Sequence, residues 1–250
     1  MFAFEHPRAY FYQFFLNLGY QILFFFYFSL IINKFIITYY IKHMNKLVLL
    51  RHGQSQWNLE NKFTGWKDVP LTEKGINEAN NAGLLLKKNN IKIDKIFSSV
   101  LERANKTAEI AIMASEIEGL HNNGILIYEK DQRLNERDYG DLVGLNKAET
   151  AEKFGKEQVH IWRRSYDTPP PNGESLKDVV DRVSPYFIET IQPFILDKKN
   201  VLIAAHGNSL RAIMIKVGMY KPEEISSIEL PTGSPLCLDY ANGQLQRHYY

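Results

Sequence analysis

Cysteine is almost absent from this chain, and its scarcity excludes two kinds of structure. Cys237 is the only cysteine among 250 residues, so neither an intramolecular disulfide nor a cysteine-rich metal centre can form. The histidines show no His-x-x-x-His spacing either. We therefore expect no metal, and positive charge in any functional site would come from side chains and backbone. A single reduced cysteine is typical of the cytoplasm, which is the location that we expect.

The chain also lacks a large excess of charge of either sign. It has 30 basic and 28 acidic residues, for a formal net charge of +2 at pH 7. Domains that bind nucleic acid usually carry a basic excess, so nucleic acid is excluded as the main partner. Hydrophobic residues make up 45% of the sequence, which is typical of a globular protein with a real core. Binding of a small anion would need a local cluster of cations.

No hydrophobic run is long enough to span a membrane, although residues 1–43 are unusually rich in aromatic and aliphatic side chains. Their longest run, ILFFFYFSLII at 22–32, ends at Asn33 and Lys34, well short of the roughly 20 residues that a membrane helix needs. We interpret 1–43 as sequence translated from a start assigned too early, with Met44 as the expected start. A membrane-associating segment and a packed extension remain open. The working domain is expected at 44–250, without membrane contact.

Short apolar runs are spaced along the working domain. The runs at 46–50 and 200–205 are continuously apolar between polar flanks, as in strands buried on both faces of a parallel sheet. The segment at 94–99 is a third candidate strand. Buried parallel strands need helices between them, so the same stretches predict where helical patterns should lie.

Helical patterns occupy the intervals between these strands. Helices are predicted over 72–90, 100–115, 146–155, 174–195 and 209–220. The second of these would begin with a capping box between Ser99 and Glu102, and the last would be capped by Asn208 or Ser209. The alternation of strands and helices predicts an α/β fold with a mainly parallel central sheet flanked by helices.

Two of the predicted strands end on a His-Gly pair. Arg51, His52 and Gly53 follow the first strand, and His206 and Gly207 follow the strand at 200–205. The carboxyl ends of parallel strands meet at one edge of a sheet, where open α/β sheets bind ligands. We expect each glycine to let backbone N–H groups approach an anion. The neighbouring cation should keep His52 neutral and therefore nucleophilic near pH 7.

Further cations and one carboxylate are expected near the same edge. Arg103 lies in the first turn after the third strand, so that Arg51 and Arg103 could grip a phosphoryl group bidentately. Glu136, in a loop crowded with basic residues, would move a proton on the substrate oxygen. The adjacent Arg163 and Arg164 suit a carboxylate or a second phosphate at the rim of a site. Taken alone, each of these could be a solvated surface residue, and a lone histidine at a strand end is more often structural.

Several segments together resemble a known family. They are RHGQSQWN (51–58), FTGW (63–66), LNERDYGDLVGLNK (134–147), WRRSYD (162–167), AHGNSLRA (205–212) and LPTGSP (230–235). From about Lys46 to Tyr250 the chain resembles the cofactor-dependent phosphoglycerate mutases, within the histidine phosphatase superfamily. The resemblance implies a three-layer α/β sandwich and interconversion of 2-phosphoglycerate and 3-phosphoglycerate in glycolysis and gluconeogenesis. It also implies a phosphohistidine intermediate primed by 2,3-bisphosphoglycerate, and it leaves a homodimer or a homotetramer open.

The resemblance also assigns roles to individual residues. It implies that His52 is the phosphohistidine nucleophile, Glu136 the proton donor and acceptor, and His206 the group that stabilises the transferring phosphoryl group. Arg51 and Arg103 complete the implied catalytic set. The implied substrate contacts are Arg51, His52, Gly53, Gln54, Ser55, Gln56, Trp57, Asn58, Thr64, Gly65, Arg103, Glu136, Arg137, Asp138, Tyr139, Lys147, Arg163, Arg164, Gly207 and Asn208.

Two rival interpretations share parts of this pattern. A phosphohydrolase on the same fold would let water discharge His52, and the cations Lys147, Arg163 and Arg164 favour a retained, doubly anionic substrate instead. A membrane-tethered binding protein with an inactive domain would depend on residues 1–43. Compared with the family, the loop after Tyr166 is short and the chain stops at Tyr250, so we expect easier access of water to His52 and some phosphatase side activity.

Overall fold

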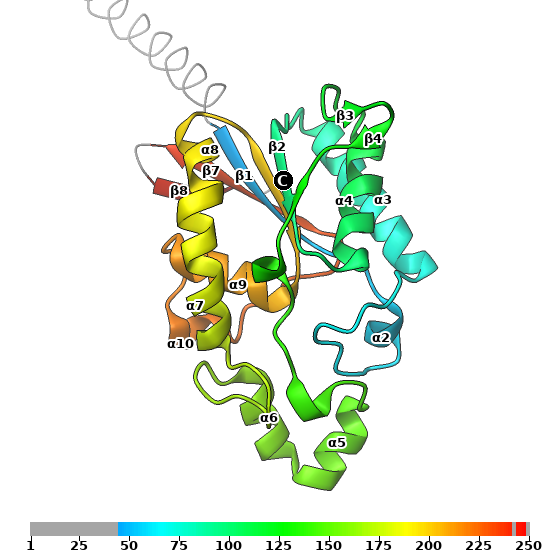
Figure 1. Cartoon of the computed structure of the whole chain (residues 1–250), viewed down its shortest axis with the longest axis vertical. Helices are drawn as coiled ribbons and strands as arrows, with labels where there is room; N and C mark the ends of the chain where they lie inside the picture. The colour runs from blue at the N-terminus through cyan, green and yellow to red at the C-terminus, as the bar shows by residue number, and fades with distance from the viewer. Residues whose placement is uncertain (1–44, 242–243, 249–250) are drawn as a thin grey trace, which may run out of the picture. The chain divides into compact units, whose positions relative to one another are not determined.

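The computed structural model of the chain describes residues 45–241 and 244–248 (Figure 1). The interpretations of residues 1–43 and of the start at Met44 concern residues outside these ranges. Within the ranges, no helix combines the length and the apolar character that crossing a membrane requires. The site residues expected from the sequence all lie within the described part of the chain.

A six-stranded sheet in the order β5-β2-β6-β1-β7-β8 forms the centre of the structure. Its strands are β1 (Asn45–Arg51), β2 (Lys95–Ser98), β5 (Glu129–Lys130), β6 (Val201–Ala205), β7 (Pro235–Ala241) and β8 (Gln244–His248). The first four strands of that order are parallel, whereas β7 and β8 form an antiparallel edge. The prediction of parallel strands at 46–50, 94–99 and 200–205 is therefore confirmed. A separate hairpin pairs β3 (His121–Asn122) with β4 (Ile125–Leu126).

Helices run between the strands over most of the predicted intervals. They are α2 (Gln56–Leu59), α3 (Glu73–Lys88), α4 (Glu102–Ser115), α5 (Lys147–Phe154), α6 (Lys156–Arg164), α7 (Leu176–Tyr186), α8 (Gln192–Leu196), α9 (Gly207–Lys216) and α10 (Pro222–Ile225), with 3-10 turns η1 (Gln132–Leu134) and η2 (Gly140–Leu142). A π-helical turn, η3 (Phe187–Ile191), joins α7 to α8 just before Pro193, whose ring would clash with an ordinary helical carbonyl.

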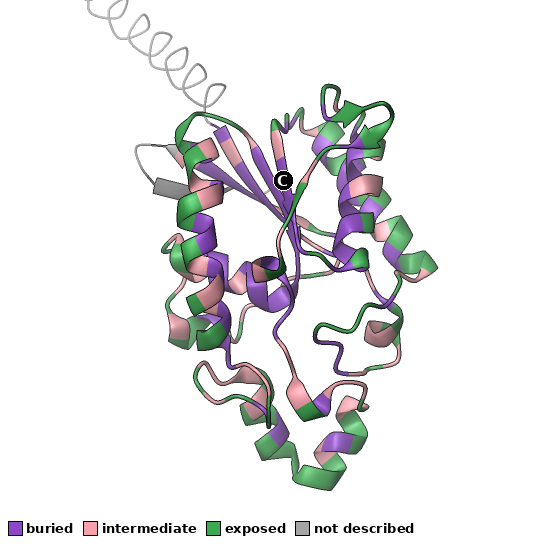
Figure 2. Ribbon diagram, in the orientation of Figure 1, coloured by how far each residue is buried: buried purple, intermediate pink, exposed green. Residues whose placement is uncertain are grey.

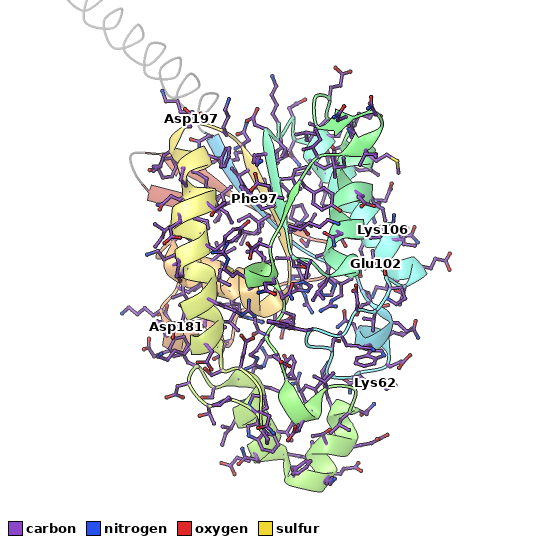
Figure 3. The ribbon with its side chains drawn as sticks, viewed as in Figure 1. Lys62, Phe97, Glu102, Lys106, Asp181 and Asp197 are labelled. Atoms are coloured by element: carbon purple, nitrogen blue, oxygen red, sulfur yellow. The ribbon has the colours of Figure 1, made fainter. Side chains whose placement is uncertain are left out.

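Alternation along β1 separates two hydrophobic layers, one on each face of the sheet. Leu47 and Leu49 pack with α7, α8 and α9, whereas Val48 and Leu50 pack with α3 and α4. Burial is concentrated in the strands and on the inner faces of these helices (Figure 2). Lys106 on α4 and Asp181 on α7 project from the outer faces of the two helical layers (Figure 3). The three-layer α/β sandwich with a mainly parallel sheet is confirmed.

Two predicted helix caps are wrong. Helix α4 begins at Glu102 with Leu101 in the cap position, and Ser99 is not its cap. The Ser99 hydroxyl instead contacts the His206 ring and accepts the N–H of the cap residue Leu101, and Asp68 accepts the Glu102 N–H at 2.9 Å. The last helix begins earlier than expected because β6 runs into it directly.

His206 itself occupies the cap position of α9, so Asn208 and Ser209 lie inside the first turn. The Ser209 hydroxyl accepts the backbone N–H of His206 at 3.1 Å. This direct junction of strand and helix fixes the direction of the His206 side chain, because no loop residue intervenes.

A smaller lobe of α5 and α6 lies beyond the carboxyl ends of the parallel strands (Figure 1). Its own hydrophobic cluster consists of Phe63, Leu142 and Val159, with Tyr139 and Trp162 packed against them. Because the lobe faces the edge at which β1 and β6 end, it brings Lys147, Arg163 and Arg164 towards the two strand-end histidines.

Candidate active site

The two strand-end histidines lie next to each other. The β1 ladder continues to His52, whose backbone N–H donates to the Ala205 carbonyl at 3.0 Å. The ring centroids of His52 and His206 are 5.0 Å apart, and their exposures are 3% and 0%. Adjacent parallel strands therefore deliver both rings to one edge of the sheet, as the sequence predicts.

Hydrogen bonding defines which nitrogen of His52 is available. Its Nδ1 lies 2.7 Å from the Gly53 carbonyl, which can only accept, so Nδ1 carries the proton. The lone pair is then on Nε2. Burial lowers the pKa of His52 well below its usual value, and the charges of Arg103 and Arg51 lower it further. His52 is thus a neutral imidazole with a free Nε2, the form required of a nucleophile.

His206 contacts the hydroxyl of Ser99, the residue that the sequence predicts to cap α4. The Ser99 Oγ lies 2.7 Å from His206 Nε2 and accepts the Leu101 N–H at 3.2 Å, so its own proton can go to the imidazole. Nδ1 of His206 then carries the ring proton. That buried nitrogen has no partner among the described residues. Burial, followed by Arg103, His52 and Arg51, lowers the pKa of His206 well below its usual value.

Arg51 and Arg103 are oriented by main-chain carbonyls and keep their charges. Arg103 donates to the carbonyls of Lys67 at 3.0 Å and Gly65 at 2.9 Å, and Arg51 donates to that of Leu230 at 2.6 Å. The Nε atoms of both arginines are buried without a partner in the described chain. Burial lowers the pKa of Arg103 to about 10, so it stays charged at neutral pH. We call His52, Arg103 and His206 the histidine cradle.

Glu136 faces the N-terminus of α9. Its Oε1 accepts the Arg137 N–H at 2.7 Å, the Asn208 N–H at 3.2 Å and the Asn208 side-chain amide at 2.8 Å. Burial raises the pKa of this carboxyl, but those hydrogen bonds and the charges of Arg51 and Arg103 outweigh it and lower the pKa overall. Glu136 is therefore an ionised carboxylate at neutral pH, ready to accept a proton.

A cavity of about 260 Å³ opens between the strand ends and the lobe. It is lined by Arg51, Glu136, Tyr139, Lys147, Arg163, Arg164, Gly207, Asn208, Arg211 and Glu229. Eight of these ten residues are expected from the sequence, while Arg211 and Glu229 are not. We call Lys147, Arg163, Arg164 and Arg211 the cation rim. With Arg51 they give five cations against two carboxylates, which is the charge balance of a site for an anion with more than one charged group.

Burial and neighbouring positive charges lower the pKa of two of the rim cations, Lys147 and Arg163. Burial lowers the pKa of Lys147 to about 8, and Arg163 and Arg51 contribute to the decrease. Burial likewise lowers the pKa of Arg163. Lys147 and Arg163 would therefore gain from a bound anion, because the anion would restore the favourable environment that burial and like charges remove.

The two His-Gly pairs have different surroundings. The Gly53 N–H donates to the Thr107 hydroxyl at 3.0 Å, so the contact of Gly53 with an anion stays a prediction. A Cβ at Gly53 would lie 2.2 Å from the carbonyl oxygen of Gly75. The glycine is needed because the first turn of α3 packs closely against the segment that follows β1. Gly207, by contrast, lines the cavity.

Other predicted contact residues lie outside the cavity wall and have local partners. Ser55 and Asn58 form a reciprocal capping box at the start of α2. The exposed Gln56 donates to Glu60 at 2.8 Å, and the Asp138 carboxylate accepts the Gly140 N–H at 3.0 Å. Among the predicted site residues, those that the structure describes outside the wall are His52, Gly53, Gln54, Ser55, Gln56, Trp57, Asn58, Thr64, Gly65, Arg103, Arg137, Asp138 and His206.

Two residues that line the cavity, Arg211 and Glu229, are not predicted from the sequence, for different reasons. Arg211 lies one helical turn after Gly207 in AHGNSLRA, so its place on the same face of α9 as Gly207 was readable from the spacing. Glu229 lies in an irregular segment before β7, where no periodicity indicates which way a side chain points. Ser99 lies beside His206, whereas the sequence pattern predicts it as a helix cap.

Comparisons with known proteins agree with this geometry. Residues 47–249 match the histidine phosphatase superfamily, branch 1. The chain is 50% identical over 190 residues to the 2,3-bisphosphoglycerate-dependent phosphoglycerate mutase of Azorhizobium caulinodans, with 76% of this chain and 89% of that protein covered. It is 54% identical over 190 residues to the protein of the same name from Nitrobacter hamburgensis, with the same shares covered.

Solved structures of similar fold include phosphatases. A mycobacterial glucosyl-3-phosphoglycerate phosphatase in complex with VO3 superposes with a TM-score of 0.69 at 26% identity, covering 82% of this chain and 98% of that chain. The α-ribazole phosphatase of Shigella flexneri gives a TM-score of 0.66 at 24% identity, covering 81% and 94% of the two chains. At that identity the second likeness establishes the fold alone.

Proposed function

The chain belongs to the histidine phosphatase superfamily, and we propose that it is a mutase that interconverts 2-phosphoglycerate and 3-phosphoglycerate. In this proposal His52 carries the phosphoryl group, residues 44–250 form the catalytic domain, and the reaction serves glycolysis and gluconeogenesis in the cytoplasm. The proposal also draws on the mutase names of relatives at about 50% identity.

The observation that carries the proposal is the cation rim on the far wall of the cavity. A hydrolase for simple phosphate esters needs cations around one phosphoryl group, and the histidine cradle with Arg51 supplies them. Four further cations line the wall contributed by α5, α6 and α9. They are the complement expected for a substrate with a second anionic group, which phosphoglycerate has in its carboxylate.

The residues of the site divide the chemistry between them. In one half-reaction Nε2 of His52 forms a bond to phosphorus as the bond from phosphorus to the substrate oxygen breaks, and Glu136 returns a proton to that oxygen. In the other half, the bond from phosphorus to Nε2 breaks as a substrate hydroxyl attacks, and Glu136 accepts the hydroxyl proton. The ionised state of Glu136 suits this second half.

Charge on the transferring phosphoryl group would be stabilised by fixed donors. Arg51 and Arg103 are anchored by carbonyls and have buried, unpartnered Nε atoms. His206 adds a ring nitrogen that also lacks a partner in the described chain. Donors that are already oriented need no reorganisation during the reaction, which is how such sites lower the barrier to phosphoryl transfer.

The residues present also fit 2,3-bisphosphoglycerate as the primer. Its two phosphates and carboxylate match the histidine cradle at one end of the site and Lys147, Arg163 and Arg164 at the other. When bound, it would supply the phosphoryl group that first loads His52. None of the described residues forms a cluster suited to a metal ion, and the mechanism above uses none.

The deciding experiment measures isomerisation and phosphate release together. The protein is given 3-phosphoglycerate, with and without a trace of 2,3-bisphosphoglycerate, and 2-phosphoglycerate and free phosphate are followed. We expect isomerisation that depends on the primer and greatly exceeds phosphate release. His52→Asn should abolish both isomerisation and acid-labile phosphorylation of the protein. Stoichiometric phosphate release without isomerisation would make the chain a phosphatase, like its solved structural relatives.

A further inference from the structure

Arg211 is a member of the cation rim to which the mechanism above assigns no individual contact. It lies on α9, one turn after Gly207, and lines the cavity together with Lys147, Arg163 and Arg164. It also lines a small adjoining hollow together with Arg137, Arg163 and Arg164, a hollow without any carboxylate. Arg211 is therefore the residue that α9 contributes to the cation rim.

The guanidinium of Arg211 is held on one side and free on the other. Its Nε and Nη2 both donate to the Ile228 carbonyl, at 3.2 and 2.7 Å. Within the described chain, its Nη1 has no hydrogen-bond partner, and no carboxylate forms an ion pair with it. The carbonyl thus fixes the plane of the guanidinium while leaving its charge and one NH2 group unused.

The free NH2 group lies beside Gly207, where it borders the cavity. A Cβ placed on Gly207 would lie 3.3 Å from Arg211 Nη1, 3.7 Å from Glu136 Oε2 and 3.8 Å from Arg51 Nε. The three groups therefore surround the same small space beside Gly207. Burial lowers the pKa of Arg211, and the neighbouring Glu136 charge opposes that decrease. A partly buried cation without a paired carboxylate is costly to keep unless an anion meets it.

We propose that Arg211 is a further substrate-binding residue, whose Nη1 donates to the anionic group of phosphoglycerate that is not being transferred. This inference rests on the proposed function. The phosphoryl group in transit has His52, Arg103 and His206 around it, all on the sheet edge. Arg211 instead faces the cavity on the side shared with Arg163 and Arg164, where the carboxylate would lie. Arg211 would then favour substrates that carry a second anionic group over substrates that lack one.

The test compares two phosphoryl donors, one with the second anionic group and one without it. Arg211→Met removes the guanidinium and keeps the stem, and p-nitrophenyl phosphate serves as the donor with no carboxylate. We expect the KM for 3-phosphoglycerate to rise about 10- to 100-fold, the effect of losing a charged hydrogen bond. Hydrolysis of p-nitrophenyl phosphate should change less than about 2-fold. Arg211→Lys should recover part of the KM, because it restores charge but not the planar fork.

Matched variants separate binding from folding. Arg133→Gln removes an arginine that pairs with Asp131 and does not line the cavity, so it should leave both reactions unchanged. Equal losses on both donors in Arg211→Met and Arg211→Lys would overturn the proposal, because Arg211 would then only anchor the Ile228 carbonyl. An unchanged KM would overturn it as well.

Failure of the proposed function would look different. If the wild-type protein binds 3-phosphoglycerate by calorimetry but does not isomerise it, the mutase proposal is wrong while Arg211 can still be tested. In that case weaker binding by Arg211→Met supports the assignment, and equal binding removes it. Where Arg211→Met does not fold, Arg211→Lys is measured in the same way, with the same two outcomes.

Discussion

The histidine cradle and the cation rim form two halves of one site, but they are supported in different ways. The cradle side chains His52, Arg103 and His206 are at most 3% exposed and stand on elements packed into the core. The rim reaches towards solvent: in the Arg164–Glu229 pair the two side chains are 31% and 80% exposed. Chemistry that must be exact in geometry is thus placed on the rigid sheet edge, and recognition of the rest of the substrate is placed on the lobe.

Main-chain carbonyls of one short segment orient Arg51 and two members of the cation rim, Arg164 and Arg211. Residues 226–230 offer the carbonyl of Ser226 to Arg164 at 3.0 Å, that of Ile228 to Arg211 at 2.7 Å and that of Leu230 to Arg51 at 2.6 Å. Alternate residues of this one segment therefore hold three guanidiniums, which come from α6, α9 and β1. A carbonyl orients a cation without neutralising it, so the charges remain available to an anion.

Glu136 stands between the two halves, and its removal should have the largest effect on the comparison. Glu136→Gln keeps the size and accepts the same hydrogen bonds at one oxygen, but it cannot take a proton. We expect isomerisation to fall about 10²- to 10⁴-fold, while binding of 3-phosphoglycerate changes little. Turnover and calorimetry measure the two quantities. Near wild-type turnover would mean that another group moves the proton.

The two strand-end glycines should separate stability from activity. Gly53→Ala forces a Cβ to within 2.2 Å of a backbone oxygen, so we expect a loss of about 3 kcal/mol in unfolding free energy. Gly207→Ala meets only side-chain atoms, the nearest at 3.3 Å, and should fold normally. Its methyl group would take the space shared by Glu136 and Arg51, so isomerisation should fall about 10-fold.

Chemical unfolding and turnover, measured on both glycine variants, check this prediction. If Gly207→Ala is destabilised as much as Gly53→Ala, the space beside Gly207 is part of the packing and not a place for substrate.

The buried histidines predict a loss of stability in mild acid. Both have a pKa in the folded protein well below the value of about 6.5 in an unfolded chain. Between these values the unfolded state binds more protons, so unfolding becomes more favourable as the pH falls below about 6.5. Each histidine should contribute up to about 1.4 kcal/mol per pH unit. Denaturant unfolding at pH 7.5 and 5.5 should show this decrease, and it should be smaller in His52→Asn.

The sequence predicts the cradle better than the rim, for a physical reason. The continuous apolar runs of β1 and β6 place His52 and His206 at strand ends, and parallel pairing then brings the rings together without further information. The wrong cap at Ser99 arose because a hydroxyl near a helix start has two competing partners, and the histidine across the sheet edge is invisible to local pattern. Glu229 depends on where the backbone of 226–230 runs, which no side-chain motif records, whereas Arg211 could be placed from its helical spacing to Gly207.

Glu229 gives the smallest expected effect in the comparison of cradle and rim. It is a carboxylate that lines the cavity beside the cation rim, so its charge is unfavourable for an anion. Its carboxylate lies 3.3 Å from Arg164 Nη2 and lines the cavity, so it repels an incoming anion while it occupies a rim cation. An exposed pair of this kind is worth at most about 1 kcal/mol. Glu229→Gln should therefore lower the KM for 3-phosphoglycerate about 2-fold, leave kcat unchanged and lose its effect in high salt, where the charge is screened. Glu223→Gln, an exposed carboxylate on α10 outside the cavity wall, is the matched control and should do nothing. A higher KM in Glu229→Gln would instead show that the carboxylate holds Arg164 in its binding position, and the rim would then depend on a side-chain ion pair as well as on main-chain carbonyls.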